Sequence, residues 1–146
     1  MVRYLVLWLL FFIGGVFTLF VSGGTVFGLF YPTSLIVVGI LPFLFVSTLF
    51  GFKEMGLAFS MPFKKETDKN KLTNGINFFK TFGKIIWLSA LIAIVIGVLT
   101  MLGLLDPNNS IGSNQKFALL SVSYAAMINI MVIIPFTTFL KKQLKE

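Results

Sequence analysis

VSGGTVFGLFYPTSLIVVGILPF, residues 21–43, decides the fold because it carries no charge and joins two strongly apolar segments. It begins with a glycine pair, continues through Tyr-Pro-Thr-Ser, and enters a run of Leu, Ile and Val that contains Pro42. Glycine and proline mark turns between regular elements. The stretch is therefore predicted to be an uncharged turn that leads into an apolar helix.

The composition of the whole chain indicates which solvent surrounds these segments. The 146 residues are 57% hydrophobic and only 12% charged, and they include 18 Phe. The mean hydropathy is +0.96. A soluble domain of this length leaves a large fraction of its surface in water and could not hide so much apolar surface. The chain is therefore predicted to be an integral membrane protein.

Four windows have the length and composition of transmembrane helices. A hydrocarbon core about 30 Å thick requires roughly 20 apolar residues of helix. Arg3 precedes the first window, but this window is rich in Phe and does not taper to small residues, which favours a retained helix over a signal peptide. The predicted fold class is an all-α membrane protein, a single membrane domain over residues 1–146 with short amphipathic cytoplasmic helices. Its predicted spans are approximately residues 4–22, 35–51, 85–105 and 117–140, with a cytoplasmic loop at 52–84.

The residue types exclude several kinds of chemistry. Cysteine and histidine are both absent, which excludes disulfides, thiolate chemistry and imidazole metal ligands. The predicted spans offer only Ser, Thr, Tyr and one Asn as polar side chains, so we expect no enzymatic catalysis, no bound metal and no cofactor. No glycine pair has the lysine and the strand–helix context of a phosphate-binding loop. The net charge of +7 comes from lysines that cluster where membrane topology explains them, so no nucleic-acid partner is expected.

The distribution of lysines predicts the orientation in the membrane. Basic residues mark the cytoplasmic side of a membrane protein. The middle loop holds seven lysines and the C-terminal tail holds three, whereas the loop at 22–34 holds none. Both termini and the middle loop are therefore predicted to be cytoplasmic, with anionic lipid as a partner of the loop. These lysines are Lys53, Lys64, Lys65, Lys69, Lys71, Lys80, Lys84, Lys141, Lys142 and Lys145.

The middle loop has helical periodicity of its own. Phe52, Met55 and Phe59 fall on one helical face, and a second apolar series leads up to the third span. Two amphipathic helices on the membrane surface are predicted, with a docking surface for a soluble partner as the alternative. The second series is Leu72, Ile76, Phe79, Phe82 and Gly83.

Small residues form stripes along the third and fourth predicted spans. Such stripes let helices approach closely in lipid. The first two spans carry bulky side chains all round, so the sequence divides into an inner and an outer pair of helices. Two interpretations of the stripes stay open. They can reflect ordinary packing within one bundle, or they can face another helix or a narrow polar path. The stripe residues are Ser89, Ala93, Gly97 and Thr100 in the third span, and Ala118, Ser121, Ala125 and Asn129 in the fourth.

Three further features of the spans bear on function. Asn129 is costly in hydrocarbon unless it finds a partner, which favours an interior surface. Pro42 and Pro135 are predicted to kink their helices. No predicted span contains a carboxylate, although an ion pathway usually carries one. If this chain conducts ions, another protein must supply the titratable group.

Several motifs resemble the MotA/TolQ/ExbB proton-channel family, and MotA in particular. GGTVFGLFYPTSLIVVGILPF is similar to the loop and second span of MotA, and GFKEMGLAFSMPF is similar to the lysine-bearing exit from that span. IGVLTMLGLLDPNNSIG resembles the end of the third span. FALLSVSYAAMINIMVIIPF resembles the fourth span, with Tyr124 and Pro135 eleven residues apart. The resemblance covers most of the chain outside the middle loop.

The resemblance implies a function and a set of partners. It implies a pentamer in a bacterial inner membrane, built around single-span partners of the MotB, ExbD or TolR type that supply the ion-carrying aspartate. Ion flow, of H⁺ or Na⁺, would then drive movement of the partner with about 2.3 kcal/mol per charge per 100 mV. In such a ring the third and fourth spans line the centre. Ser89, Ala93, Gly97, Thr100, Ser121, Ala125 and Asn129 would face this centre.

The chain also departs from the family pattern. About 30 residues replace the large cytoplasmic domain of MotA that engages the flagellar rotor. Trp87 stands where the family has a proline, while Ile94 and Val122 stand where it has threonines. Two alternatives therefore stay open. One is a non-conducting scaffold of the same fold that holds a partner helix, and the other is a small four-helix transporter that acts alone.

Overall fold

A computed structural model describes residues 2–21, 23, 28, 30–64, 68–104 and 111–145. The chain divides into two units, residues 1–32 and residues 33–146, which are described separately. Every regular element among the described residues is helical. The predicted ends at residues 22 and 105 lie outside the described residues, as do Gly24, Lys65, Glu66 and Asp106.

The first unit contains helix α1, Val2–Val21, which covers most of the first predicted span. Its 20 residues correspond to about 30 Å of helix, the thickness of a hydrocarbon core. Trp8 and Phe12 stack four residues apart, with ring centroids 6.1 Å apart. Whether α1 crosses the membrane stays a prediction.

The second unit is built on three helices that are each long and apolar enough to cross a membrane. The first, Pro32–Phe50, consists of α2 (Pro32–Leu35), the π-helical turn η2 (Ile36–Ile40) and α3 (Leu41–Phe50). The second is α5, Lys69–Met101. The third, Ile111–Lys145, consists of α6 (Ile111–Ile128), the π turn η4 (Asn129–Ile133) and α7 (Ile134–Lys145). Three apolar helices of this length indicate an all-helical, membrane-embedded protein.

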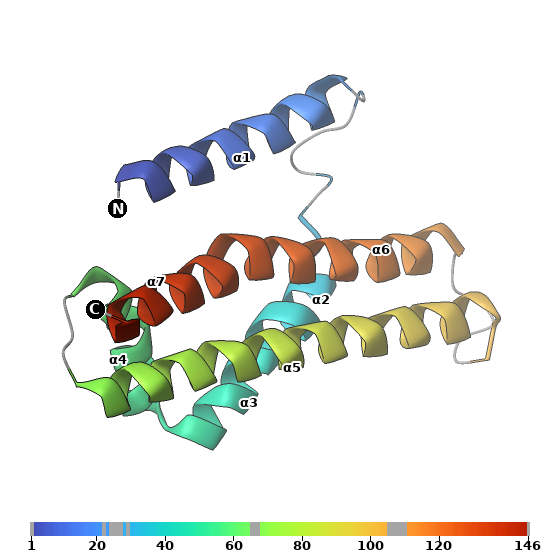
Figure 1. Cartoon of the computed structure of the whole chain (residues 1–146). Helices are drawn as coiled ribbons and strands as arrows, with labels where there is room; N and C mark the ends of the chain where they lie inside the picture. Colours follow the sequence, from blue (N-terminus) through green and yellow to red (C-terminus); the bar gives the residue numbers. More distant parts are fainter. Residues whose placement is uncertain are drawn as a thin grey trace. The chain divides into compact units, whose positions relative to one another are not determined.

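Helix α5 and the α6–α7 helix lie side by side and antiparallel along most of their length (Figure 1). One series of buried positions in α5 recurs at alternating intervals of three and four residues, which is the spacing of a left-handed helix pair, and Gly75, Phe78 and Phe82 are buried beside this series. The helix passes the predicted loop–span boundary at residue 85 without interruption. With 33 residues it is about 50 Å long, so it extends well beyond the hydrocarbon core. The buried series is Leu72, Ile76, Phe79, Gly83, Ile86, Ala90, Ala93 and Gly97.

Both ends of α5 are capped. The Asp68 carboxylate accepts a hydrogen bond from the Asn70 amide at 2.9 Å, which satisfies one of the free N–H groups of the first turn. At the other end Gly103 has a φ of 71°, and the amide of Leu104 donates to the Leu99 carbonyl at 3.1 Å. This is the glycine-dependent Schellman termination. The helix therefore ends at Met101, a few residues before the predicted end of the third span.

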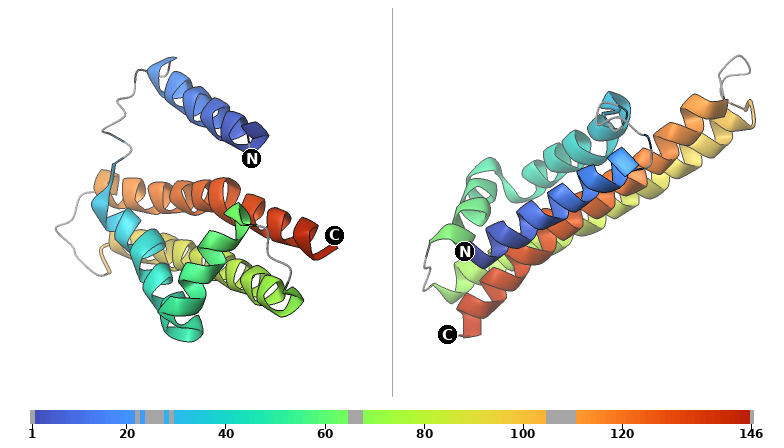
Figure 2. Two further views of the ribbon diagram at one scale, coloured as in Figure 1. Left: turned by 90° about the vertical axis from the view of Figure 1, so that its left-hand side faces the viewer. Right: turned by 90° about the horizontal axis from the view of Figure 1, so that it is seen from above.

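A short helix, α4 (Phe52–Ser60), followed by the 3₁₀ turn η3 (Met61–Phe63), packs onto the first half of α5 (Figure 2). Gly51 separates α3 from α4 with a φ of 83°, a backbone conformation that favours glycine. The predicted helix in this segment is present, but its apolar face is rotated. Phe52 is 66% exposed, whereas Ala58 is buried and Met55 and Phe59 pack against the core.

An aromatic cluster fixes α4 in this position. Phe59 contacts four other rings at centroid distances of 5.3 to 6.5 Å, most of them edge to face. Pairs of this geometry contribute about 0.5–1.5 kcal/mol each beyond burial of their area. The cluster joins α3, α4, α5 and α7, so the middle loop belongs to the folded core. The rings that contact Phe59 are Phe43, Phe78, Phe79 and Phe136.

Two of the three prolines in the long helices follow a π turn. Pro42 comes two residues after η2 ends, and Pro135 comes two residues after η4 ends. Proline removes an N–H and its ring crowds the preceding turn, and a π turn places an extra residue there. The sequence predicts a kink at each of these two positions, and in the structure a π turn comes just before each proline.

Candidate functional site

The candidate site is the contact between α5 and the α6–α7 helix, which we call the seam. Its residues are Gly83, Ala90, Ala93 and Gly97 of α5, and Ala118, Ser121, Ala125 and Asn129 of the facing helix. It contains most of the small residues that the sequence analysis identified. Its geometry shows what those residues do.

One close approach in the seam is at Gly97. A Cβ atom placed there would lie 2.9 Å from the Ala118 Cβ and 3.1 Å from the Asn114 carbonyl oxygen. Both distances are shorter than van der Waals contact, so only glycine fits without displacing the neighbouring helix. Small residues on both sides let the two backbones approach closely, as in other membrane helix pairs.

A second close approach pairs Gly83 with Asn129. A Cβ atom at Gly83 would lie 2.9 Å from the Asn129 Oδ1 and 3.1 Å from a methyl group of Ile133. The Asn129 side chain donates from Nδ2 to the Ala125 carbonyl at 2.9 Å. The single asparagine of the fourth span is thus held at the start of the π turn, with its amide against α5.

The predicted central residues divide into two groups by burial. Ala93, Ser121 and Ala125 have 0% exposure within a single chain, and Gly97 is also buried. Packing inside one bundle, the alternative that the sequence left open, accounts for these four in this structure. Ser89, Thr100 and Asn129 are half-buried and keep surface that a partner could contact. That any of them faces the centre of a ring stays a prediction.

The hydroxyl groups near the seam bond to backbone carbonyls of their own helix. Ser121 donates to Phe117 at 2.8 Å, and Thr100 donates to Ile96 at 2.7 Å. Such bonds satisfy a hydroxyl in an apolar environment without a partner from another helix. Among the buried side-chain polar atoms that the structure describes, the Thr137 hydroxyl oxygen is the one that lacks a hydrogen-bond partner.

Ser34 is a site residue that the sequence analysis missed. It is fully buried, and its hydroxyl donates to the Phe117 carbonyl at 3.0 Å, so that one carbonyl accepts from two helices. The sequence was interpreted as a turn at Tyr-Pro-Thr-Ser, whereas the helix already begins at Pro32. Proline is favoured in the first turn of a helix, so Pro32 is the feature of the sequence that could have indicated this helix start.

The chemistry of the site is limited to packing and weak hydrogen bonding. Among the described residues, no group of His, Cys, Asp or Glu side chains is placed to hold a metal ion. Ile94 and Val122, for which the resemblance implies threonines in the family, are half-buried and apolar. The close contacts of the seam therefore fix the position of α5 against the α6–α7 helix. Comparison with protein-family models, with curated proteins and with solved structures found no match.

Proposed function

We propose that this chain is a small subunit of an ion-driven membrane complex of the MotA/TolQ/ExbB type, in a bacterial inner membrane with both termini cytoplasmic. The observation that carries the proposal is the close-packed pair of long apolar helices without a carboxylate in any predicted span. Such a pair suits a subunit that surrounds a single-span partner and takes the ion-carrying aspartate from it. In this proposal α1 also crosses the membrane, as the first of four spans.

Exposed apolar surface on the second unit supports assembly in a membrane. Large side chains on the outer faces of α3 and α5 are each about half exposed, and they need lipid or another subunit to cover them. A homopentamer would cover part of this surface at each subunit contact. These side chains include Leu44, Phe45, Leu49, Leu88, Leu91, Ile92 and Val95.

A partner helix would contact the edge of the seam. Ser89 and Thr100 lie on α5 and keep exposed surface, whereas Ala93 and Gly97 between them are covered by the facing helix. We therefore expect Ser89→Leu to weaken binding of the single-span partner while the subunit still folds. Unchanged partner binding in this variant would remove Ser89 from the proposed contact.

The experiment that tests the assembly is native mass spectrometry of the complex, purified gently from its own host. The proposal expects five copies of this chain with two copies of a single-span, aspartate-bearing protein. A monomer or a dimer without such a partner would contradict it.

A non-conducting scaffold of the same architecture is the second candidate. Two observations favour it: the hydroxyls of Ser121 and Thr100 are engaged with backbone carbonyls, and Ile94 and Val122 replace polar positions of the family. Proton flux into liposomes that contain the intact complex separates the two functions. Flux that disappears when the partner's aspartate becomes asparagine supports the ion-driven complex, and an intact complex without flux supports the scaffold.

A further inference from the structure

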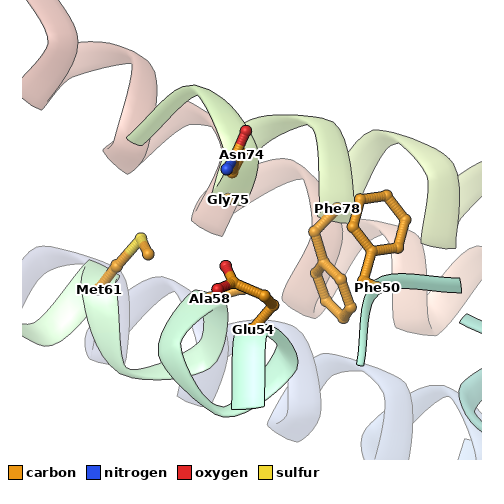
Figure 3. A pocket seen from close by; sticks show the side chains of 7 residues that line it. All are labelled: Phe50, Glu54, Ala58, Met61, Asn74, Gly75 and Phe78. Carbon is orange, nitrogen blue, oxygen red and sulfur yellow. The ribbon is translucent and has the colours of Figure 1, made fainter. Parts of the chain in front are cut away.

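A cavity of about 170 Å³ lies outside the seam, between α4, the end of α3 and the first half of α5 (Figure 3). Its walls are mainly apolar and include the rings of Phe50 and Phe78, which meet edge to face with centroids 5.5 Å apart. Two polar side chains complete the lining, Glu54 from α4 and Asn74 from α5. The remaining lining residues are Ala58, Met61 and Gly75.

Among the described residues of this lining, Glu54 is the only charged one, and both Glu54 and Asn74 are exposed. Figure 3 shows it extending from α4 towards the α5 side of the cavity. Among the residues that the structure describes, its carboxylate makes neither a hydrogen bond nor an ion pair. Glu54 lies in the first turn of α4, where a carboxylate interacts favourably with the helix dipole. This interaction does not account for the apolar cavity beside the side chain.

The cavity lies where the apolar parts of two spans end. Phe50 is the last residue of α3, and Lys53 follows it closely in α4. Gly75 in the opposite wall approaches Leu140, which is the last residue before Lys141. Lysines commonly flank the ends of spans at the headgroup level. The cavity is therefore at the depth of lipid headgroups on the cytoplasmic side.

We propose that this cavity binds the ethanolamine headgroup of an aminophospholipid. A primary ammonium carries three N–H donors, for which the Glu54 carboxylate and the Asn74 carbonyl oxygen are acceptors, and the faces of Phe50 and Phe78 also attract a cation. Cavities of about 150 Å³ hold a benzene-sized group, so an ethanolamine group fits. Lys53, the neighbour of Glu54 in the chain, is the cation proposed for the lipid phosphate.

The test is a lipid titration of the full-length protein in detergent, followed by native mass spectrometry. Phosphatidylethanolamine is compared with phosphatidylcholine and phosphatidylglycerol of identical acyl chains. Phosphatidylcholine has no N–H donor on its headgroup and phosphatidylglycerol has no ammonium. A charge-assisted hydrogen bond predicts about tenfold tighter binding of phosphatidylethanolamine than of phosphatidylcholine.

Two variants remove the site in different ways. Glu54→Gln should reduce the tenfold preference to less than about twofold, and Ala58→Leu should do the same by filling the cavity from α4. Asp68→Asn is the matched control, because it removes one negative charge at the start of α5 and keeps a residue that caps a helix equally well. The control should retain the tenfold preference.

Four outcomes decide the proposal. The expected losses in both variants, with the control unchanged, support it. Equal binding of the ethanolamine and choline lipids by the wild type overturns it, as does a Glu54→Gln variant that keeps the preference. Displacement of the lipid by free ethanolamine or putrescine at millimolar concentration overturns the lipid as ligand and assigns the site to a soluble amine.

Discussion

Replacing Gly97 with alanine tests the geometry of the seam most directly. The added methyl group would lie 2.9 Å from the Ala118 Cβ and 3.1 Å from the Asn114 carbonyl oxygen. Neither atom is at the end of a flexible side chain, so the two helices must separate to accept it. Overpacking of this kind costs about 1–3 kcal/mol. Alanine recovers up to about 1 kcal/mol through its higher helix propensity. The expected net effect is a loss of up to about 2 kcal/mol in the free energy of unfolding relative to the wild type, and of about 1–3 kcal/mol relative to an alanine at an unhindered helical glycine.

The measurement is unfolding in mixed detergent micelles with increasing SDS, followed by circular dichroism. Gly56→Ala is the matched control, since a methyl group at this helical position meets no atom within 4 Å. It should leave stability unchanged or raise it by up to about 1 kcal/mol. Gly83→Ala should fall between them, because the nearest atom there, the Asn129 Oδ1, can move by rotation of its side chain. A Gly97→Ala variant as stable as the Gly56→Ala control would refute the close approach of α5 and α6.

Three further predictions concern other parts of the fold. Gly51→Ala should destabilise the protein by about 1–3 kcal/mol, because residue 51 has a φ of 83° that alanine adopts only with strain; thermal unfolding in detergent measures this loss. Ser34→Ala should cost about 0.5–1.5 kcal/mol in the same assay, since the Phe117 carbonyl keeps its bond from Ser121, and a cost above 3 kcal/mol would show that the bond has another role. Glutamine in place of all lysines of the 52–84 loop should weaken the cytoplasmic preference of this loop. Labelling of a cysteine introduced at residue 70 reports the change, and a wild-type loop labelled from outside would contradict the topology.

The long helices could be predicted from the sequence because an apolar run of about 20 residues leaves few alternatives. Length and the absence of charge located the helices that became Pro32–Phe50, α5 and Ile111–Lys145. Most of their ends are shifted by a few residues, but α5 begins at Lys69, far before the predicted start of the third span at residue 85. Those ends depend on local backbone chemistry. Gly103 ends α5 by its positive φ, and Pro32 begins the preceding long helix inside what was interpreted as a turn. A hydropathy profile does not show where either of these two helix ends lies.

The rotation of α4 shows a second limit of sequence periodicity. Phe52, Met55 and Phe59 have helical spacing, but Phe52 is exposed, because Gly51 changes the chain direction and the Phe59 ring occupies the centre of an aromatic cluster. Periodicity indicates that one face is apolar, whereas the depth of that face in the core depends on residues distant in sequence. The cavity at Glu54 depends on the same long-range packing, so no local pattern predicted it.

The seam limits how an ion-driven complex could use this chain. Close packing requires small residues and satisfied hydroxyls, whereas an ion path requires polar groups with exposed lone pairs. Within one chain, close packing is provided by Ala93, Gly97, Ser121 and Ala125. These four residues are buried, so they have no exposed surface that could line an ion path. In the proposed ion-driven complex, a path along this helix pair would run beside the half-buried polar residues Ser89, Thr100 and Asn129, with the charge supplied by the partner. Replacing Ser89 and Thr100 by valine should then abolish flux while the fold is retained, and flux that persists in this double variant would place the path elsewhere.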